Sequence, residues 1–143
     1  MEQQDPQVPD YNWNTIPVRE SRKGIMQRVF RGNDVLIGYS ELHPHMDPSP
    51  HSHPYEQIFM IVKGKVKLHV GEQVIACSEG SVVRIPPDVV HWAEPPAAED
   101  GVAINMDIWT PYRPDFGQFT AYQTDEFSAT AADANARCLD EQR

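Results

Sequence analysis

The sequence has little positive charge and no long hydrophobic run. Its 12 lysine and arginine residues face 21 acidic ones, for a formal net charge of -9. Such a chain repels phosphate backbones and anionic lipid headgroups, so we expect neither nucleic acid nor a membrane surface as a partner. No apolar stretch approaches the roughly 20 residues that span a bilayer. The opening segment Met1–Asp5 is polar and acidic, unlike a secretory signal.

Cysteine is also scarce. Cys77 and Cys138 are the only two in the sequence, too few for a disulfide scaffold, and free thiols suit a reducing compartment. Together with the absence of a visible signal, this favours a cytoplasmic protein. The length of 143 residues corresponds to a single domain.

Helical periodicity with capping residues is absent before residue 124, and the 13 prolines divide the chain into short pieces. We expect an N-terminal arm over residues 1–17 that lies on the body or is partly disordered, a β-barrel over 18–120, and a C-terminal tail over 121–143 with a short helix around Ala131–Leu139. Short strands separated by turn residues every 8–12 positions are typical of an all-β sandwich or barrel. The predicted strands are Ile25–Phe30, Val35–Leu42, Ile58–Val62, Val66–Val70, Gln73–Cys77, Ser81–Ile85, Val89–Trp92 and Val102–Trp109.

Histidine supplies the strongest chemical signal. In an extended segment, His51, His53 and Gln57 have equal parity and point to one side, and His91 follows a Pro-Pro-Asp turn from which a neighbouring strand enters. Three imidazoles and one oxygen donor suit a divalent first-row metal with positions left open for substrate. The plainer alternative is that the His-x-His pair is simply solvated.

Three further histidines are weaker candidates. His43 and His45 form a rival pair, but their flanking prolines make a shared strand face less certain. His69 alternates with Leu68 and Val70, which is typical of a surface position on a half-buried strand.

Two spaced motifs resemble those of the cupin superfamily. The run His51-x-His53-xxx-Gln57, continued to Gly64, is similar to the first cupin motif, and the run from Gly80 through Pro86-Pro87-Asp88 to His91 is similar to the second. The resemblance extends over about residues 24–116. It implies a conical β-barrel of two antiparallel sheets (a jelly roll), with one divalent transition metal, iron, manganese, nickel or zinc, held by His51, His53, Gln57 and His91.

The chain departs from these motifs at four positions. Gln57 stands where most cupins carry glutamate, and Glu56 lies one position early, where parity turns it away from the metal unless the strand bulges. A neutral amide oxygen leaves more of the metal's charge uncompensated, which favours an anionic substrate oxygen. Asp88 replaces a usual glycine and Pro95 a frequent asparagine, and we expect neither to affect the metal.

A second cluster follows near the end of the last predicted strand. Asp107 and Trp109 share parity, and a carboxylate that faces a metal-containing cavity is a candidate general acid or base. Arg113 offers a planar fork for a substrate carboxylate. The alternatives are that Asp107 pairs with Arg113 or lies at a solvated strand end, and that Trp109 only packs in the core.

The run Asp107-x-Trp109-Thr110-Pro111-x-Arg113-x-Asp115-Phe116, together with Ile85-Pro86-Pro87 and His91, resembles the KdgF-type cupins, which linearise unsaturated uronates. That resemblance implies Asp107 as acid/base, Trp109 as the aromatic wall and Arg113 as the carboxylate clamp. The KdgF-type pattern has phenylalanine where this chain has the bulkier Trp109, so the pocket suits a different substrate.

Three functions follow in order of preference. The first is a metal-dependent lyase or isomerase acting on a small carbonyl or hydroxy-acid substrate, with Asp107 moving a proton and Arg113 holding a carboxylate. The second is a dioxygenase resembling quercetinase-like or diketone-cleaving cupins, and the third is a non-catalytic small-molecule-binding module. Small cupins usually pair by exchanging N-terminal strands, so we also expect a homodimer to which residues 1–17 contribute.

Overall fold

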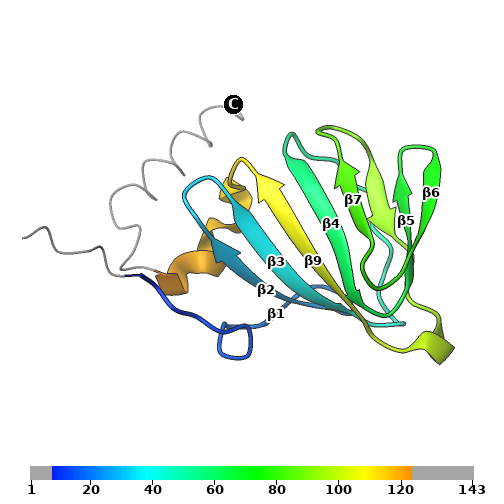
Figure 1. The fold of residues 1–143 in the computed structure, drawn as a ribbon, viewed down its shortest axis with the longest axis horizontal. Helices are drawn as coiled ribbons and strands as arrows, with labels where there is room; N and C mark the ends of the chain where they lie inside the picture. Colours follow the sequence, from blue (N-terminus) through cyan, green and yellow to red (C-terminus); the bar gives the residue numbers. More distant parts are fainter. Residues whose placement is uncertain (1–7, 124–143) are drawn as a thin grey trace, which may run out of the picture.

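The computed structural model describes residues 8–123, so the predicted helix around Ala131–Leu139 lies outside the described residues. Nine strands form two antiparallel sheets that face each other (Figure 1). A six-stranded sheet has the order β1-β2-β3-β9-β4-β7, and a three-stranded sheet has the order β6-β5-β8. The strands are β1 (Arg19–Arg22), β2 (Ile25–Arg31), β3 (Leu36–Leu42), β4 (Glu56–Lys63), β5 (Val66–Val70), β6 (Gln73–Cys77), β7 (Val82–Ile85), β8 (His91–Ala93) and β9 (Ala103–Thr110). Two 3-10 helices complete the described chain, η1 (Ala98–Asp100) and η2 (Pro114–Gln123).

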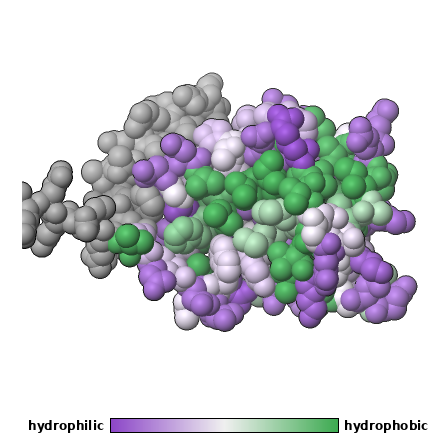
Figure 2. Space-filling model, in the orientation of Figure 1, coloured by the Kyte–Doolittle hydropathy of each residue, from purple (hydrophilic) through white to green (hydrophobic). Residues whose placement is uncertain are grey.

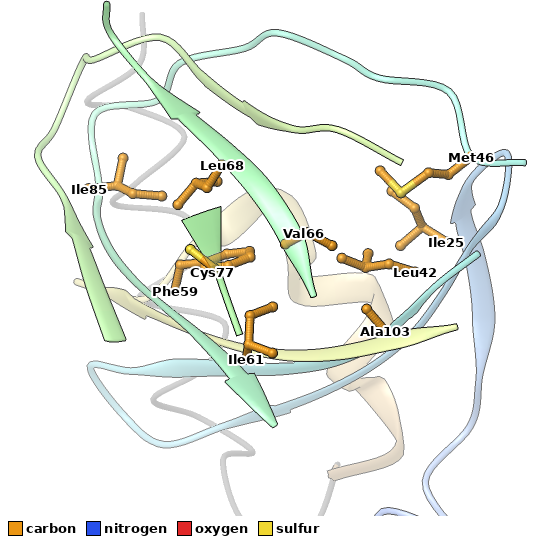
Figure 3. Close-up of a cluster of buried hydrophobic side chains, with 10 residues drawn as sticks. All are labelled: Ile25, Leu42, Met46, Phe59, Ile61, Val66, Leu68, Cys77, Ile85 and Ala103. Carbon is orange, nitrogen blue, oxygen red and sulfur yellow. The ribbon is translucent and has the colours of Figure 1, made fainter. Parts of the chain in front are cut away.

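Strict alternation of buried and half-buried residues along β2, β3 and β9 gives the large sheet one inward face. Side chains on that face meet those of the small sheet, because residues of equal parity on a strand point the same way. The resulting cluster draws on both sheets (Figure 3), with Phe59 and Ile61 of β4 facing Val66 and Leu68 of β5. The all-β prediction is therefore confirmed, and the core lies between the sheets.

Several strand boundaries differ from the prediction by a residue or two. The strand expected over Ile58–Val62 begins two residues earlier, at Glu56, and the strand expected over Val89–Trp92 begins two residues later, at His91. The preceding turn places Asp88 in the left-handed region with φ of 66°. Aspartate tolerates that conformation better than most residues, which explains how it replaces the glycine that is usual there.

Three elements were not predicted: β1, η1 and η2. Strand β1 is a short polar edge strand without hydrophobic alternation in its sequence, and both 3-10 helices precede residue 124, where the sequence shows no helical periodicity with caps. A 3-10 helix has three residues per turn rather than 3.6, so it escapes a search for α-helical periodicity. Helix η2 packs beside a second cluster of Val29, Leu36, Trp109 and Tyr112.

The described part of the N-terminal arm lies on the body. Tyr11 contacts the rings of Phe30 and Tyr122, Trp13 stacks on Tyr39 at a centroid distance of 5.4 Å, and Ile16 is buried. Residues 8–17 thus extend the cover of the large sheet within the same chain.

Candidate metal centre

Three histidines converge at one end of the barrel from two chain segments. His51 and His91 form an isolated antiparallel bridge, in which each backbone N–H donates to the other's carbonyl, at 3.2 and 2.9 Å. His53 precedes β4, and its carbonyl accepts a hydrogen bond from the backbone N–H of Asp88 at 2.8 Å. This third bond connects the segment that carries His51 and His53 to the turn that precedes His91. One ligand nitrogen from each histidine lies within 4.8 Å of the others.

Backbone carbonyls select the tautomer of each ring. Nδ1 of His51 lies 2.6 Å from the carbonyl of Ser49, Nδ1 of His53 lies 3.0 Å from that of Tyr55, and Nδ1 of His91 lies 2.8 Å from that of Val89. A carbonyl oxygen only accepts, so each Nδ1 carries the hydrogen and donates it. Each Nε2 then keeps a free lone pair, as in ligating histidines whose other nitrogen is held by a backbone carbonyl.

Burial keeps these rings neutral. It lowers the pKa of His51, His53 and His91, in the last case to about 4. Neighbouring positive charge from Arg113 lowers all three further. At neutral pH the imidazoles are therefore uncharged, which is the form that binds a metal.

Gln57 adds an oxygen donor whose direction is fixed. Its Nε2 donates to Oδ1 of Asp107 at 2.7 Å, so its Oε1 points back to Nε2 of His53 at 3.0 Å. With the hydrogen of His53 on Nδ1, two acceptor atoms face each other. Nε2 of His91 is also buried without a hydrogen-bond partner. A cation satisfies all of these lone pairs at once, so the donor set fits a divalent transition metal.

Asp107 is buried, 6% exposed, and both of its oxygens accept hydrogen bonds. Oδ2 accepts from Nδ2 of Asn105 at 2.9 Å, and Oδ1 accepts from Gln57. Burial raises the pKa of Asp107 to about 6, while these two amides and the charges of Arg113 and Arg22 oppose the rise. The carboxyl group can thus gain or lose a proton near neutral pH.

A cavity of about 350 Å³ lies between the candidate metal ligands and the side chains near the end of β9. Its wall includes His51, Gln57, His91, Asp107, Trp109 and Arg113. Trp109 is 4% exposed, and its ring centroid lies 5.5 Å from that of Phe116, on which it stacks. Trp109 therefore packs in the core and also lines the cavity. Arg113 pairs with Asp115 through two nitrogens, Nε at 3.1 Å and Nη2 at 2.6 Å. The alternative pairing of Arg113 with Asp107 is not present.

The remaining candidates lie elsewhere. The rings of His43 and His45 contact each other at 5.4 Å and do not line the cavity. His69 stacks on Trp92 at 3.7 Å and bonds to Glu94 at 2.8 Å, so it is half-buried rather than a solvated surface residue. Glu56 is turned away from the histidines, as parity predicts, and pairs with Arg84.

Sequence reasoning missed several cavity residues. Asn105 was detectable, because it shares the parity of Asp107 on the same strand and points to the same face. Arg19 and Arg22 gave no signal, since β1 itself was not predicted. Phe116 and Phe119 reach the cavity from η2, which was not predicted either.

Comparison with known proteins identifies the fold family. The family model described as "Cupin domain" matches residues 38–108. The chain contains a cupin domain. An RmlC-like cupin from Shewanella frigidimarina superposes with a TM-score of 0.68 at 18% identity, covering 77% of this chain and 96% of the other. KdgF from a Halomonas species superposes with a TM-score of 0.65 at 17% identity, covering 74% and 97%. At these identities, the structural likeness shows the cupin fold alone.

One curated relative is similar in sequence. A gentisate 1,2-dioxygenase from a Haloferax species is 33% identical over 76 residues, which is 53% of this chain and 20% of that protein. The matched region therefore spans about a fifth of the relative's length. Among the described residues, no helix is long and apolar enough to cross a membrane.

Proposed function

We propose that this cupin is a metal-dependent enzyme of the lyase or isomerase type that acts on a small carbonyl or hydroxy-acid substrate. An unsaturated uronate is the example that the KdgF-type resemblance suggests. One observation carries the proposal: His51, His53 and His91 bring their ligand nitrogens within 4.8 Å of one another, and two of them, His51 and His91, line the cavity that Asp107 and Arg113 also line. A Lewis-acid site beside a titratable carboxyl and a guanidinium is the constellation that proton transfer next to a carbonyl requires.

Each residue has a defined task in this mechanism. His51, His53, Gln57 and His91 would hold the metal, which when bound polarises substrate oxygens and stabilises developing negative charge. Arg113, oriented by its two bonds to Asp115, holds a substrate carboxylate.

Asp107 takes a proton from the carbon next to the polarised carbonyl and returns it at another substrate atom. The stacked rings of Trp109 and Phe116 exclude water from one side of the cavity.

Replacing the carboxyl group tests this assignment. We expect Asp107→Asn to lower turnover at least about 100-fold, because an amide cannot accept the proton. The number of metal ions bound per chain at saturating metal should remain that of the wild type. The substituted side chain keeps one oxygen, which can still accept a hydrogen bond from the amide of Gln57 or Asn105. Asp34→Asn, in an exposed turn, is the matched control. Unchanged turnover in Asp107→Asn would remove Asp107 from the mechanism.

A dioxygenase is the second candidate, favoured by the 33% identity to a stretch of gentisate 1,2-dioxygenase. Metal-loaded protein assayed with unsaturated uronates, diketones, flavonols and gentisate, with and without oxygen, separates the two. A lyase or isomerase keeps its rate under anaerobic conditions, whereas a dioxygenase stops. Binding of one of these compounds without any conversion would favour the non-catalytic module instead.

A further inference from the structure

Two arginines of the edge strand β1 face the cavity although they stand three positions apart. In a regular strand, residues at odd separation point to opposite faces. The pairing of β1 with β2 shifts register between Glu20 and Arg22, so that Arg19 lies opposite Gln27 and Arg22 lies opposite Ile25. Both β2 residues are buried on the inward face. The bulge therefore turns Arg22 to the same side as Arg19, and both line the cavity.

Arg19 shares an aromatic ring with Arg113. The two guanidinium carbons lie 5.2 and 4.3 Å from the centroid of Phe116, and that of Arg19 lies 3.2 Å from the centroid of Phe119. Nη2 of Arg19 donates to Oε1 of Gln27 at 3.0 Å, but its Nε is buried without a partner. Burial and the neighbouring Arg113 both lower the pKa of Arg19. An anion between the two guanidinium groups offsets their repulsion.

Arg22 places a further positive charge in the wall of the cavity. Its Nη1 donates to the carbonyl of Ser49 at 3.3 Å, and the same carbonyl accepts from Nδ1 of His51. Arg22 is thus one carbonyl away from a candidate metal ligand. Because the β2 partners of Arg19 and Arg22 are two residues apart, the two arginines enter the cavity about 7 Å from each other along the strand.

The charges of the cavity differ from those of the chain. Three arginines and two aspartates line the cavity, whereas the whole chain carries a formal charge of -9. Asp115 is bound to Arg113, and Asp107 already accepts two amide hydrogen bonds. Among the described cavity residues, no carboxylate forms an ion pair with Arg19 or Arg22.

We propose that the cavity binds a short dicarboxylate, with one carboxylate between Arg113 and Arg19 and the other at Arg22. This inference rests on the proposed function, because it takes the cavity beside the candidate metal ligands as the substrate site. The inference narrows the substrate class from any hydroxy or carbonyl acid to an acid with two carboxylates. A uronate, which has a single carboxylate, falls outside this class.

Glutarate and pentanoate are matched probes, because both have a five-carbon chain and differ by one carboxylate. Titration calorimetry with metal-free and zinc-loaded protein measures the affinity for each. We expect wild-type protein to bind glutarate at least about tenfold more tightly than pentanoate. In Arg22→Gln the preference should disappear, whereas Arg19→Gln should weaken both ligands by a similar factor.

Lys23→Gln is the control, since it removes the same charge from an exposed turn residue next to Arg22 and should keep the preference. Arg22 is itself exposed, so its replacement leaves the core intact, and circular dichroism verifies this. Equal affinities in the wild type, or a glutarate preference that survives in folded Arg22→Gln, would overturn the proposal. A preference that persists in metal-free protein while turnover and metal binding are absent would support the subsite and reject the proposed enzyme.

Discussion

The ability of His51, His53 and His91 to bind a metal through Nε2 depends on the hydrogen bond that each ring makes through Nδ1. Each Nδ1–H is held by the carbonyl of a residue two positions away, Ser49, Tyr55 or Val89. These bonds fix both the ring plane and the tautomer, so the cost of ordering the ligands is met by the fold before any ion binds. Asp107 does the same for Gln57 by holding its amide nitrogen.

Gly38 shows how tightly the wall of the cavity is packed. A Cβ added there would lie 2.9 Å from Cη2 and Cζ3 of the Trp109 indole. We expect Gly38→Ala to lower the free energy of unfolding by about 1–3 kcal/mol, because the added methyl group would push the Trp109 indole out of its stacked position on Phe116. Urea unfolding followed by fluorescence measures the change.

The compensating variant is Gly38→Ala combined with Trp109→Phe, which has the smaller ring of the KdgF-type pattern. Its loss of stability should be smaller than the sum of the two single losses. Full stability of Gly38→Ala alone would show that Gly38 does not restrict the indole.

At the scale of elements, one side chain docks η2 onto the sheet. Oε1 of Gln123 accepts from the backbone N–H of Arg31 at 2.9 Å, and Nε2 of Gln123 donates to the Arg31 carbonyl at 3.0 Å. The amide thus completes the end of β2 as a further strand would. Because η2 also carries Phe116 and Phe119, this contact positions the aromatic side of the cavity.

We predict that Gln123→Ala destabilises the protein by about 1–3 kcal/mol, since it leaves two buried backbone groups of Arg31 without partners. Gln118→Ala, at an exposed position of the same helix, should change stability by less than about 0.5 kcal/mol. Thermal and urea unfolding of both variants give the comparison. Equal effects would mean that the Gln123 contacts do not hold η2.

The sequence allowed the long strands to be predicted, because alternation along Val66–Val70 and along the β2, β3 and β9 segments reflects a sheet with one buried face. Parity also put His51 and His53 on one side, whereas His91 was added because it follows the Pro-Pro-Asp turn and completes the second cupin-like motif, and the structure brings all three together. Strand β1 and helix η2 could not be found this way: one is a four-residue polar edge strand, and the other lacks α-helical spacing. Arg19 and Arg22 depend on a bulge, which no periodicity reveals.

At the scale of the whole molecule, a band of hydrophobic side chains runs across the large sheet (Figure 2). Ile58 and Met60 of β4 alternate with the buried residues of that strand and pair with Ile108 and Met106 of β9. The predicted homodimer stays a prediction, as do the cytoplasmic location and the domain limits at residues 17 and 120.

The cavity can attract an anion although the chain as a whole is negatively charged. Three arginines gather in one cavity, while the formal charge of the chain is -9. A local positive field inside a negative molecule directs anions to the cavity and keeps them from the rest of the surface. Two of these arginines come from β1 and the third from the loop after β9, so the field depends on the fold.

Metal binding tests most directly whether His51, His53 and His91 form a metal site. Metal-free protein is dialysed against iron, manganese, nickel or zinc and analysed for bound ions. We expect one ion per chain, with affinity lost at least about 100-fold in His91→Ala and unchanged in His69→Ala, whose ring bonds to Glu94 instead. Wild-type protein that binds none of these ions, or His91→Ala that binds them as tightly as the wild type, would contradict this expectation.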